Sequence, residues 1–370
     1  MMNNQLPERG KTQRNSQLSQ KVIRLSAISS SFTLGISHGV ADAAAGFLLG
    51  SLPRTMSLEQ ASWLIILYNI LGFGYQPLAG ILTDQLKRPR ESVLVGLFLL
   101  LLALVVAGWQ SQLAVVLAGM GSAAFHVGGG SLAISATPNR TTGPGIFAAP
   151  GVVGLAVGGA LGWTGYSVTV PLVLLLGLMI GVTVLLNLPR LPHTNPKSQI
   201  PNSKSEDWVM LVLLVAIALI STVWTSFQFL LQTQLNFIIA LAVAAAIAKI
   251  FGAILAQRWG WWRWIVGSLA VATLLLLFGA QNRLTLLLAL ALLQSTIPIT
   301  LAVTAQMMPQ QPATASGLAL GLAIILGSIP ILGGLSLIAV TPTISALVVI
   351  VTALSLCWVF QSKAFSSKSG

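Results

Sequence analysis

Long apolar segments alternate with short polar ones along almost the whole chain. A helix that crosses the ~30 Å hydrocarbon core of a bilayer needs about 20 mainly apolar residues, and segments of this length recur throughout the sequence. The pattern predicts twelve transmembrane helices, at residues 25–50, 61–82, 92–109, 113–136, 145–163, 167–188, 208–231, 236–256, 264–280, 284–306, 314–338 and 343–361. Several glycines and Pro330 interrupt the segment 314–338, so we expect that helix to be kinked or closely packed.

One polar interior segment, residues 189–207, divides these helices into two sets of six and contains four prolines. We predict an all-α integral membrane protein with two six-helix pseudo-repeats, an arrangement known from secondary transporters. A weak internal echo supports the repeat, since LAISA at 132–136 is similar to LAVTA at 301–305. The expected parts are a disordered cytoplasmic tail (1–24), an N-terminal lobe (25–188), a cytoplasmic linker (189–207), a C-terminal lobe (208–361) and a cytoplasmic tail (362–370).

Composition and charge support a multi-pass membrane protein and determine its orientation. The chain is 55% hydrophobic and only 7% charged, whereas a soluble domain has about a quarter charged residues. The net charge of +12 comes from Lys and Arg in alternate loops and both tails, while Arg54 and Arg283 lie on the other side. By the positive-inside rule, both termini are cytoplasmic and the basic residues are topology signals rather than a nucleic-acid surface. We expect the protein in the inner (plasma) membrane of the cell.

The sequence contains few features that would indicate an enzyme or a metal-binding protein. Cys357 is the only cysteine, and the three histidines lack the spacing of a zinc site. No Walker loop, GxSxG or HExxH pattern is present. The prediction is therefore a protein that is not an enzyme and has no cofactor and no metal.

Titratable residues within the predicted spans are the main candidates for function. His38 and Asp42 lie four residues apart, hence on one face of the first helix, and His126 lies at a similar depth in the fourth. Ionisable groups inside a membrane are costly and mostly functional, and histidine titrates near neutral pH. We interpret His38, Asp42 and His126 as a proton-coupling group; the alternative is a hydrogen-bonded set that only fixes helix packing.

Other polar residues in the spans are candidates of lower weight. A substrate cavity is expected to include some of Asn69, Tyr75, Gln76, Gln228 and Gln294. Lys249 has two interpretations: its side chain extends to the interface, which we favour, or it provides a charge for substrate. Gly154, Gly158 and Gly162 recur every four residues, a spacing that permits close helix approach.

The loop after the second predicted helix carries a family resemblance. Its Gly80, Leu82, Asp84 and Arg88 match the signature loop of the major facilitator superfamily, whereas Gln85 replaces a basic residue and Lys87 replaces a glycine. The segments Ser37-His38-Gly-Val-Ala-Asp42 and Gly121-Ser-Ala-Ala-Phe125-His126 resemble the fosmidomycin-resistance-like branch of that superfamily. The resemblance is clear over residues 35–165 and implies a two-lobed twelve-helix fold with alternating access.

The same loop predicts a gate. A carboxylate at the cytoplasmic end of a helix can accept hydrogen bonds from a neighbouring helix N-terminus and from arginine. We assign Asp84, Arg88 and Arg90 to this gate, with an ordinary solvated turn as the alternative.

These observations predict a secondary active transporter that exports a small organic compound in exchange for protons. Its expected partners are the substrate, protons and the lipid bilayer, and it is expected to act as a monomer. Three alternatives stay open: an uncoupled or uptake carrier of a small metabolite, a transporter-like scaffold or assembly factor for pigment or protein complexes, and, last, a membrane-embedded enzyme. The substrate, the direction and the stoichiometry do not follow from the sequence.

Overall fold

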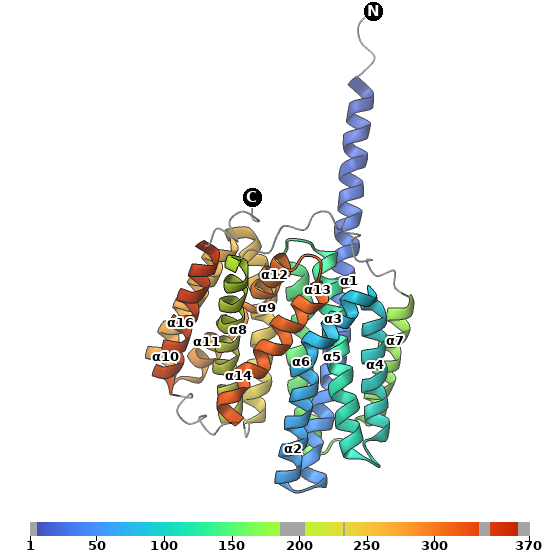
Figure 1. Cartoon of the computed structure of the whole chain (residues 1–370), viewed down its shortest axis with the longest axis vertical. Coiled ribbons are helices and arrows are strands. Elements are labelled where there is room, and N and C mark those ends of the chain that lie inside the picture. Colours follow the sequence, from blue (N-terminus) through green and yellow to red (C-terminus); the bar gives the residue numbers. More distant parts are fainter. Residues whose placement is uncertain (1–5, 186–203, 232–233, 333–340, 362–370) are drawn as a thin grey trace, which may run out of the picture.

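The computed structural model describes residues 6–185, 204–231, 234–332 and 341–361, and within these ranges the chain forms helices and connecting turns without strands. The helices form two lobes side by side (Figure 1). The N-terminal lobe contains α1 (Leu6–Thr55), α2 (Leu58–Asn69), η1 (Ile70–Gly74), α3 (Gln76–Leu86), α4 (Pro89–Val106), α5 (Ser111–Ala136), α6 (Thr142–Thr164) and α7 (Thr169–Leu185). The C-terminal lobe contains α8 (Lys204–Leu230), α9 (Leu235–Trp259), α10 (Trp261–Gly279), α11 (Arg283–Gln294), α12 (Ile297–Met307), α13 (Pro312–Ser316), η3 (Gly317–Leu322), α14 (Ala323–Leu332) and α16 (Pro342–Gln361).

These helices confirm the predicted membrane architecture. Eleven described helical segments are long and apolar enough to cross a bilayer, and α7, a shorter apolar helix, takes the sixth of the twelve predicted places. Two of the spans combine elements with a π-helical turn between them: α2, η1 and α3 form Leu58–Leu86, and α13, η3 and α14 form the eleventh span. The chain is thus an all-α, multi-pass membrane protein.

The boundaries differ from the expected ones at several places. Residues 6–24, expected as a disordered tail, continue α1, whose apolar span is Ile28–Thr55 and whose start projects beyond the other helices (Figure 1). An existing helix is extended more easily than a new one is nucleated, and this segment is rich in Arg, Lys, Gln and Leu, of good or moderate helix propensity. Residues 333–338 of the eleventh predicted span and 189–203 of the predicted linker lie outside the described residues.

Glycines hold α1 and α6 together in the N-terminal lobe. A Cβ on Gly158 would lie against the main chain of Ala43, and a Cβ on Gly154 against that of Gly39. Gly162 approaches the main chain of Phe47 and Ser51 in the same way. The predicted role of this glycine series in close packing is therefore confirmed, and it aligns the two helices that carry His38, Asp42 and Phe147.

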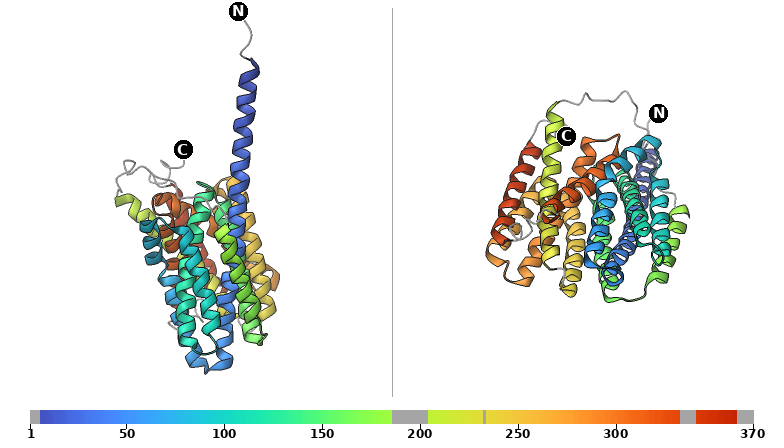
Figure 2. Two further views of the ribbon diagram at one scale, coloured as in Figure 1. Left: turned by 90° about the vertical axis from the view of Figure 1, so that its right-hand side faces the viewer. Right: turned by 60° about the horizontal axis from the view of Figure 1, so that its bottom comes forward.

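Polar and close contacts join the two lobes in one half of the bundle. Thr141 donates its hydroxyl to the carbonyl of Ala253 at 2.7 Å, and the Gln306 amide donates to the Asn139 side chain at 3.3 Å. These residues, like Gly80 beside Ala313, lie toward the ends of the spans that the charge pattern predicts as cytoplasmic. Figure 2 shows the two lobes from two further directions. We call this region the cytoplasmic contact.

Candidate functional site

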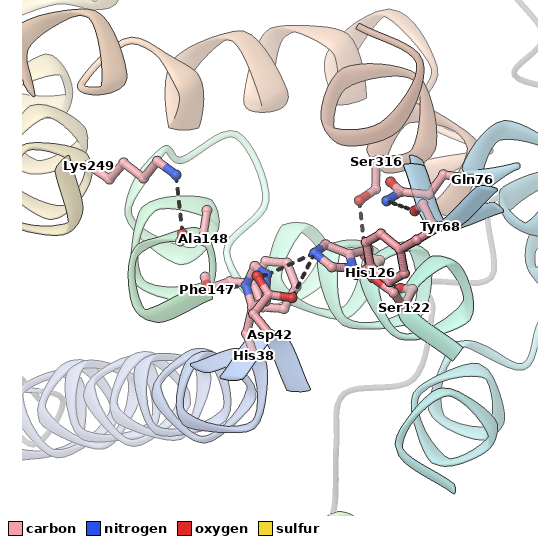
Figure 3. Close-up of polar contacts among 11 residues, drawn as sticks. His38, Asp42, Tyr68, Gln76, Ser122, His126, Phe147, Ala148, Lys249 and Ser316 are labelled. Atoms are coloured by element: carbon pink, nitrogen blue, oxygen red, sulfur yellow. Dashed lines mark hydrogen bonds and ion pairs between the residues drawn. The ribbon is translucent and has the colours of Figure 1, made fainter. Parts of the chain in front are cut away.

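Three titratable side chains from two helices meet in the interior of the N-terminal lobe (Figure 3). His38 Nε2 lies 3.1 Å from Asp42 Oδ2 within α1, and His126 Nε2 of α5 lies 3.6 Å from Asp42 Oδ1. The two Nε2 atoms are 3.0 Å apart. All three residues are buried, so the structure brings together the group that the sequence proposed for proton coupling.

The depth of this triad agrees with a site near the bilayer midplane. His38 lies ten residues from the predicted cytoplasmic start of the span Ile28–Thr55, and His126 lies ten residues from the cytoplasmic end of Ser111–Ala136. Ten residues of α-helix span about 15 Å, which is half of a ~30 Å hydrocarbon core.

Helix α6 fixes the orientation of the His38 ring. Pro150, within α6, lacks the backbone N–H that would bond the Ile146 carbonyl, which loosens the helix locally. The neighbouring carbonyl of Phe147 accepts a hydrogen bond from His38 Nδ1 at 2.8 Å, and the Phe147 ring stacks on the imidazole at 4.6 Å between centroids. A Cβ on Gly151 would lie 2.6 Å from His38 Cδ2, so glycine at this position provides the space for the ring.

The hydrogen bonds assign the tautomers of both histidines. The carbonyls of Phe147 and Ser122 only accept, so His38 Nδ1 and His126 Nδ1, at 2.8 and 2.7 Å from them, each carry hydrogen. In two neutral imidazoles, both Nε2 atoms then present lone pairs to each other at 3.0 Å. Such a contact is repulsive unless a proton or another cation lies between the nitrogens, and one added proton on the pair, balanced by the Asp42 carboxylate, makes it favourable.

A polar chain continues from the triad toward the C-terminal lobe. Tyr68 donates its hydroxyl to Ser122 Oγ at 3.1 Å, and Ser122 Oγ lies 3.2 Å from His126 Nδ1. Ser316 of α13 donates to the His126 carbonyl at 3.3 Å from across the lobe boundary. His126 of the triad is therefore in direct contact, through its main chain, with an element of the other lobe.

Lys249 lies close to the same site. Its Nζ donates to the carbonyl of Ala148 in α6 at 3.4 Å, and the residue is only 9% exposed. The structure thus differs from the interpretation that we favoured: the side chain does not extend along α9 to the interface but reaches across to the other lobe (Figure 3). The sequence could not select this outcome, because the position of α6 beside α9 is a tertiary feature.

Asp84 joins the lobes at the cytoplasmic contact. Its carboxylate accepts hydrogen bonds from the backbone N–H groups of Ala313 and Thr314 at 3.0 and 2.7 Å, and from the Thr314 hydroxyl at 2.7 Å. These groups form the N-terminus of the eleventh span, where an anion is favoured by the helix dipole. The expected helix N-terminus is therefore the partner of Asp84.

The expected arginine contacts with Asp84 are not formed among the described residues. Arg88 is exposed, and Arg90 instead donates to the carbonyls of Thr183 and Val184 at the described end of α7. Arg90 therefore stabilises a helix C-terminus within its own lobe. Lys87, at the position where the family signature has glycine, has φ +54°, a left-handed conformation that explains the glycine preference.

The predicted cavity residues do not form one group. Gln76 is fully buried at the lobe boundary, where its amide donates to the Gly72 carbonyl at 2.7 Å and its Oε1 has no partner. Asn69 donates to the Ile65 carbonyl of its own helix, and Tyr75 packs on a small apolar cluster shared by the lobes. Gln294 is buried and Gln228 is half-buried in the C-terminal lobe.

The triad is also compact enough for a divalent cation, because one potential ligand atom from each of its side chains lies within 4.8 Å of the others. Two imidazoles and a carboxylate are common metal ligands. The 3.0 Å contact between the Nε2 atoms is nevertheless the length of an ordinary hydrogen bond. A shared proton accounts for this geometry without a metal.

A two-lobed helical bundle with buried titratable groups at mid-depth is the architecture of a membrane transporter. The sequence profile of the Major Facilitator Superfamily matches residues 27–335, and the chain belongs to that family. It is therefore a secondary transporter and not an enzyme. The more specific fosmidomycin-resistance-like branch stays a prediction.

Solved structures agree with this fold. A crystal structure of the transporter FucP in the outward conformation has a TM-score of 0.70 at 16% identity, covering 90% of this chain and 99% of that one. A second structure, of the E. coli fucose:proton symporter FucP, has a TM-score of 0.65 at 15% identity, covering 90% and 98% of the chains. The human organic anion transporter MFSD10 has a TM-score of 0.69 at 14% identity, covering 91% and 99%. No curated protein sequence matches the chain.

Proposed function

We propose that this protein is a proton-coupled secondary active transporter of a small organic compound. The observation that carries the proposal is the pair of Nε2 atoms of His38 and His126, 3.0 Å apart beside Asp42. Each imidazole donates its Nδ1–H to a carbonyl, which leaves the two Nε2 atoms to share a proton in this arrangement. The position near mid-depth makes that proton available to either side in turn.

Alternating access would connect the triad, and the proton that it holds, with each side of the membrane in turn. The described state is closed at the cytoplasmic contact, where Asp84 is bonded to Ala313 and Thr314. Opening this end breaks those bonds and separates Ser316 from His126, whose carbonyl it contacts. Because Ser316 is hydrogen-bonded to the main chain of His126, lobe movement acts directly on the helix that carries this imidazole.

The protein acts, in this proposal, as a monomer in the inner (plasma) membrane with both termini in the cytoplasm. The uneven distribution of Lys and Arg supports the orientation. Export is the direction that the branch resemblance implies, and uptake is the alternative. The cavity residues and the gate roles of Arg88 and Arg90 stay predictions; contacts within the N-terminal lobe give Arg90 a structural role as well.

The test measures flux driven by a pH gradient. Purified protein is reconstituted in liposomes with an equimolar mixture of small organic acids, sugars and amines, and mass spectrometry quantifies each compound inside and outside. We expect the wild type to concentrate at least one compound when a pH gradient is imposed. Asp42→Asn and His126→Gln should lose this accumulation but retain exchange of the same compound without a gradient.

Asp207→Asn is the matched control, because Asp207 is an exposed acid at the start of the seventh span. Flux indifferent to the pH gradient would replace the proposal by an uncoupled carrier. Absence of flux for all compounds, together with stable co-purifying proteins, would favour the scaffold. A chelator added to each assay tests whether a trace metal at the triad contributes.

A further inference from the structure

Lys249 is a buried cation that the proton mechanism does not use. It lies ten residues from the C-terminal end of α9, about 15 Å from the predicted cytoplasmic surface, which is beyond the reach of a lysine side chain. Its hydrogen-bond partner is a main-chain carbonyl, that of Ala148, at a long 3.4 Å. Among the described residues, no carboxylate lies within ion-pairing distance of its ammonium group.

The charges around Lys249 leave one positive charge uncompensated. Helix α9 packs on α6, α10, α11 and α12. Of these, α6 and α12 contain no charged residue, and Arg263 of α10 and Arg283 of α11 lie near helix ends. Across the boundary, Asp42 attracts Lys249 electrostatically, and His38 and His126 lie beside Asp42.

The charge balance of this region follows from the shared proton. With one added proton, the triad of His38, His126 and Asp42 is neutral, and Lys249 makes the whole region positive by one charge. A buried unpaired cation is unfavourable, and an anion brought beside it relieves that cost. One added negative charge would therefore neutralise this region while the triad holds its proton.

The lobe movement makes this charge available. The bond between Lys249 and Ala148 joins the C-terminal lobe to the N-terminal lobe within the closed half of the bundle. It breaks when that half opens, and the ammonium group then needs another acceptor. A bound oxyanion replaces the carbonyl with a charge-assisted hydrogen bond, which is the stronger interaction.

We propose that Lys249 binds an oxyanion group of the substrate, a carboxylate or a phosphate ester, and that this anion and the triad proton bind together. The inference rests on the proposed function and specifies its substrate class. Co-binding carries the proton and the anion in the same direction. An inward proton gradient then drives uptake, so this inference favours the uptake alternative over the export that the resemblance implies.

The test uses pairs in which an anion is compared with a neutral relative on the same carbon skeleton. Benzoate and benzamide, lactate and lactamide, and glycerol phosphate and glycerol are each added to the purified full chain, and binding is measured by calorimetry at pH 6 and pH 8. We expect one anion to bind more tightly than its neutral partner, and more tightly at pH 6. Lys249→Gln should lower the affinity for that anion by about 10- to 100-fold, whereas Lys249→Arg should retain most of this affinity.

Arg258→Gln, which removes an exposed cation from the same helix, is the matched control. In liposomes, uptake of a carboxylate with one proton transfers no net charge, so an imposed membrane potential should leave its rate unchanged, whereas a doubly charged phosphate ester taken up with one proton would carry one negative charge inward. The inference is overturned if only neutral or cationic compounds bind, or if Lys249→Gln binds the anion as the wild type does. Preference for carboxylate over phosphate ester, or the reverse, identifies the oxyanion.

A pH gradient that drives no flux of any compound would instead overturn the proposed function, while Lys249-dependent anion binding would survive.

Discussion

Asp84 makes the best-defined side-chain contact between the two lobes. Its carboxylate has three donors on α13, at 2.7 to 3.0 Å. Hydrogen bonds to a charged group contribute about 1.5–3 kcal/mol each, and the helix dipole adds to the attraction. Because all three bonds cross the boundary, their energy stabilises the closed cytoplasmic contact rather than either lobe alone.

Replacement of Asp84 by Asn should therefore favour opening at this end. The amide keeps one acceptor oxygen but loses the charge and places an NH₂ group against backbone donors, so we expect at least about a 10-fold rise in the open population. The reporter is a cysteine at Ala313, which is fully buried against Ala79, Ala123 and Val127 in the closed contact, in a Cys357→Ser background. Maleimide labelling of this cysteine should accelerate in the Asp84→Asn variant.

Glu91→Gln, at an exposed acid near the same membrane surface, is the control for lost charge. Equal labelling rates in the Asp84→Asn protein and in this control would contradict a gate at Asp84.

Single residues show which features the sequence predicts and which it does not. The four-residue spacing of His38 and Asp42 and the similar depth of His126 follow from helix geometry alone, and these residues do meet. The tautomers do not follow, because they depend on the carbonyl of Phe147 in another helix. The partner of Lys249 does not follow for the same reason, and Asp84 selects backbone groups of α13 over the arginines next to it in sequence.

At the scale of helices, the pairing of α1 with α6 supports the site. His38 and Asp42 lie on α1, and Phe147, which orients His38, lies on α6. The glycines of α6 allow the two backbones to approach until a Cβ would overlap the opposite main chain. Small residues at four-residue spacing act in membranes by this close packing.

An added methyl group in this contact should destabilise the protein. Gly158→Ala places a Cβ against the main chain of Ala43, and inserting a group into a packed contact costs about 1–3 kcal/mol. Gly177→Ala in α7 is the matched control, since nothing lies within 4 Å of its added Cβ. We expect the apparent Tm in detergent to fall in the Gly158→Ala variant and to be unchanged or raised in the Gly177→Ala variant. An equal change of Tm in both would show that backbone propensity, not packing, determines the stability.

Hydropathy predicts the helices well but not their internal geometry. The spans appear where apolar segments are long enough to cross a bilayer, and α7, with 17 described residues, lies at the sixth predicted place. The π-helical turns η1 and η3 are not visible in that pattern. They lie where Gly321 approaches the Phe73 carbonyl across the lobe boundary, at a contact between two segments that are distant in sequence.

At the scale of the whole molecule, the described bonds and close approaches between lobes share one half of the bundle. Asp84, Thr141 and Lys249 each bond the opposite lobe there, from three different helices or their connecting turns. Two rigid lobes held together at one end exchange that contact for one at the other end when they rock. A scaffold would have no need for such an exchange.

This difference leads to a test with spin labels at both ends. In a Cys357→Ser background, one pair is placed at Gln85 and Gln310 on the predicted cytoplasmic side, and another at Gln110 and Gln281 on the opposite side; all four residues are exposed. Asp84→Asn removes bonds on the first side, so a transporter should show longer distances for the first pair and shorter ones for the second. Pulsed electron paramagnetic resonance measures both distributions. A scaffold predicts that the first pair broadens while the second is unchanged, because loosening one end of a static bundle does not close the other. Opposite changes in the two pairs require the lobes to rock as rigid bodies, which is the movement that would expose the triad proton to each side in turn.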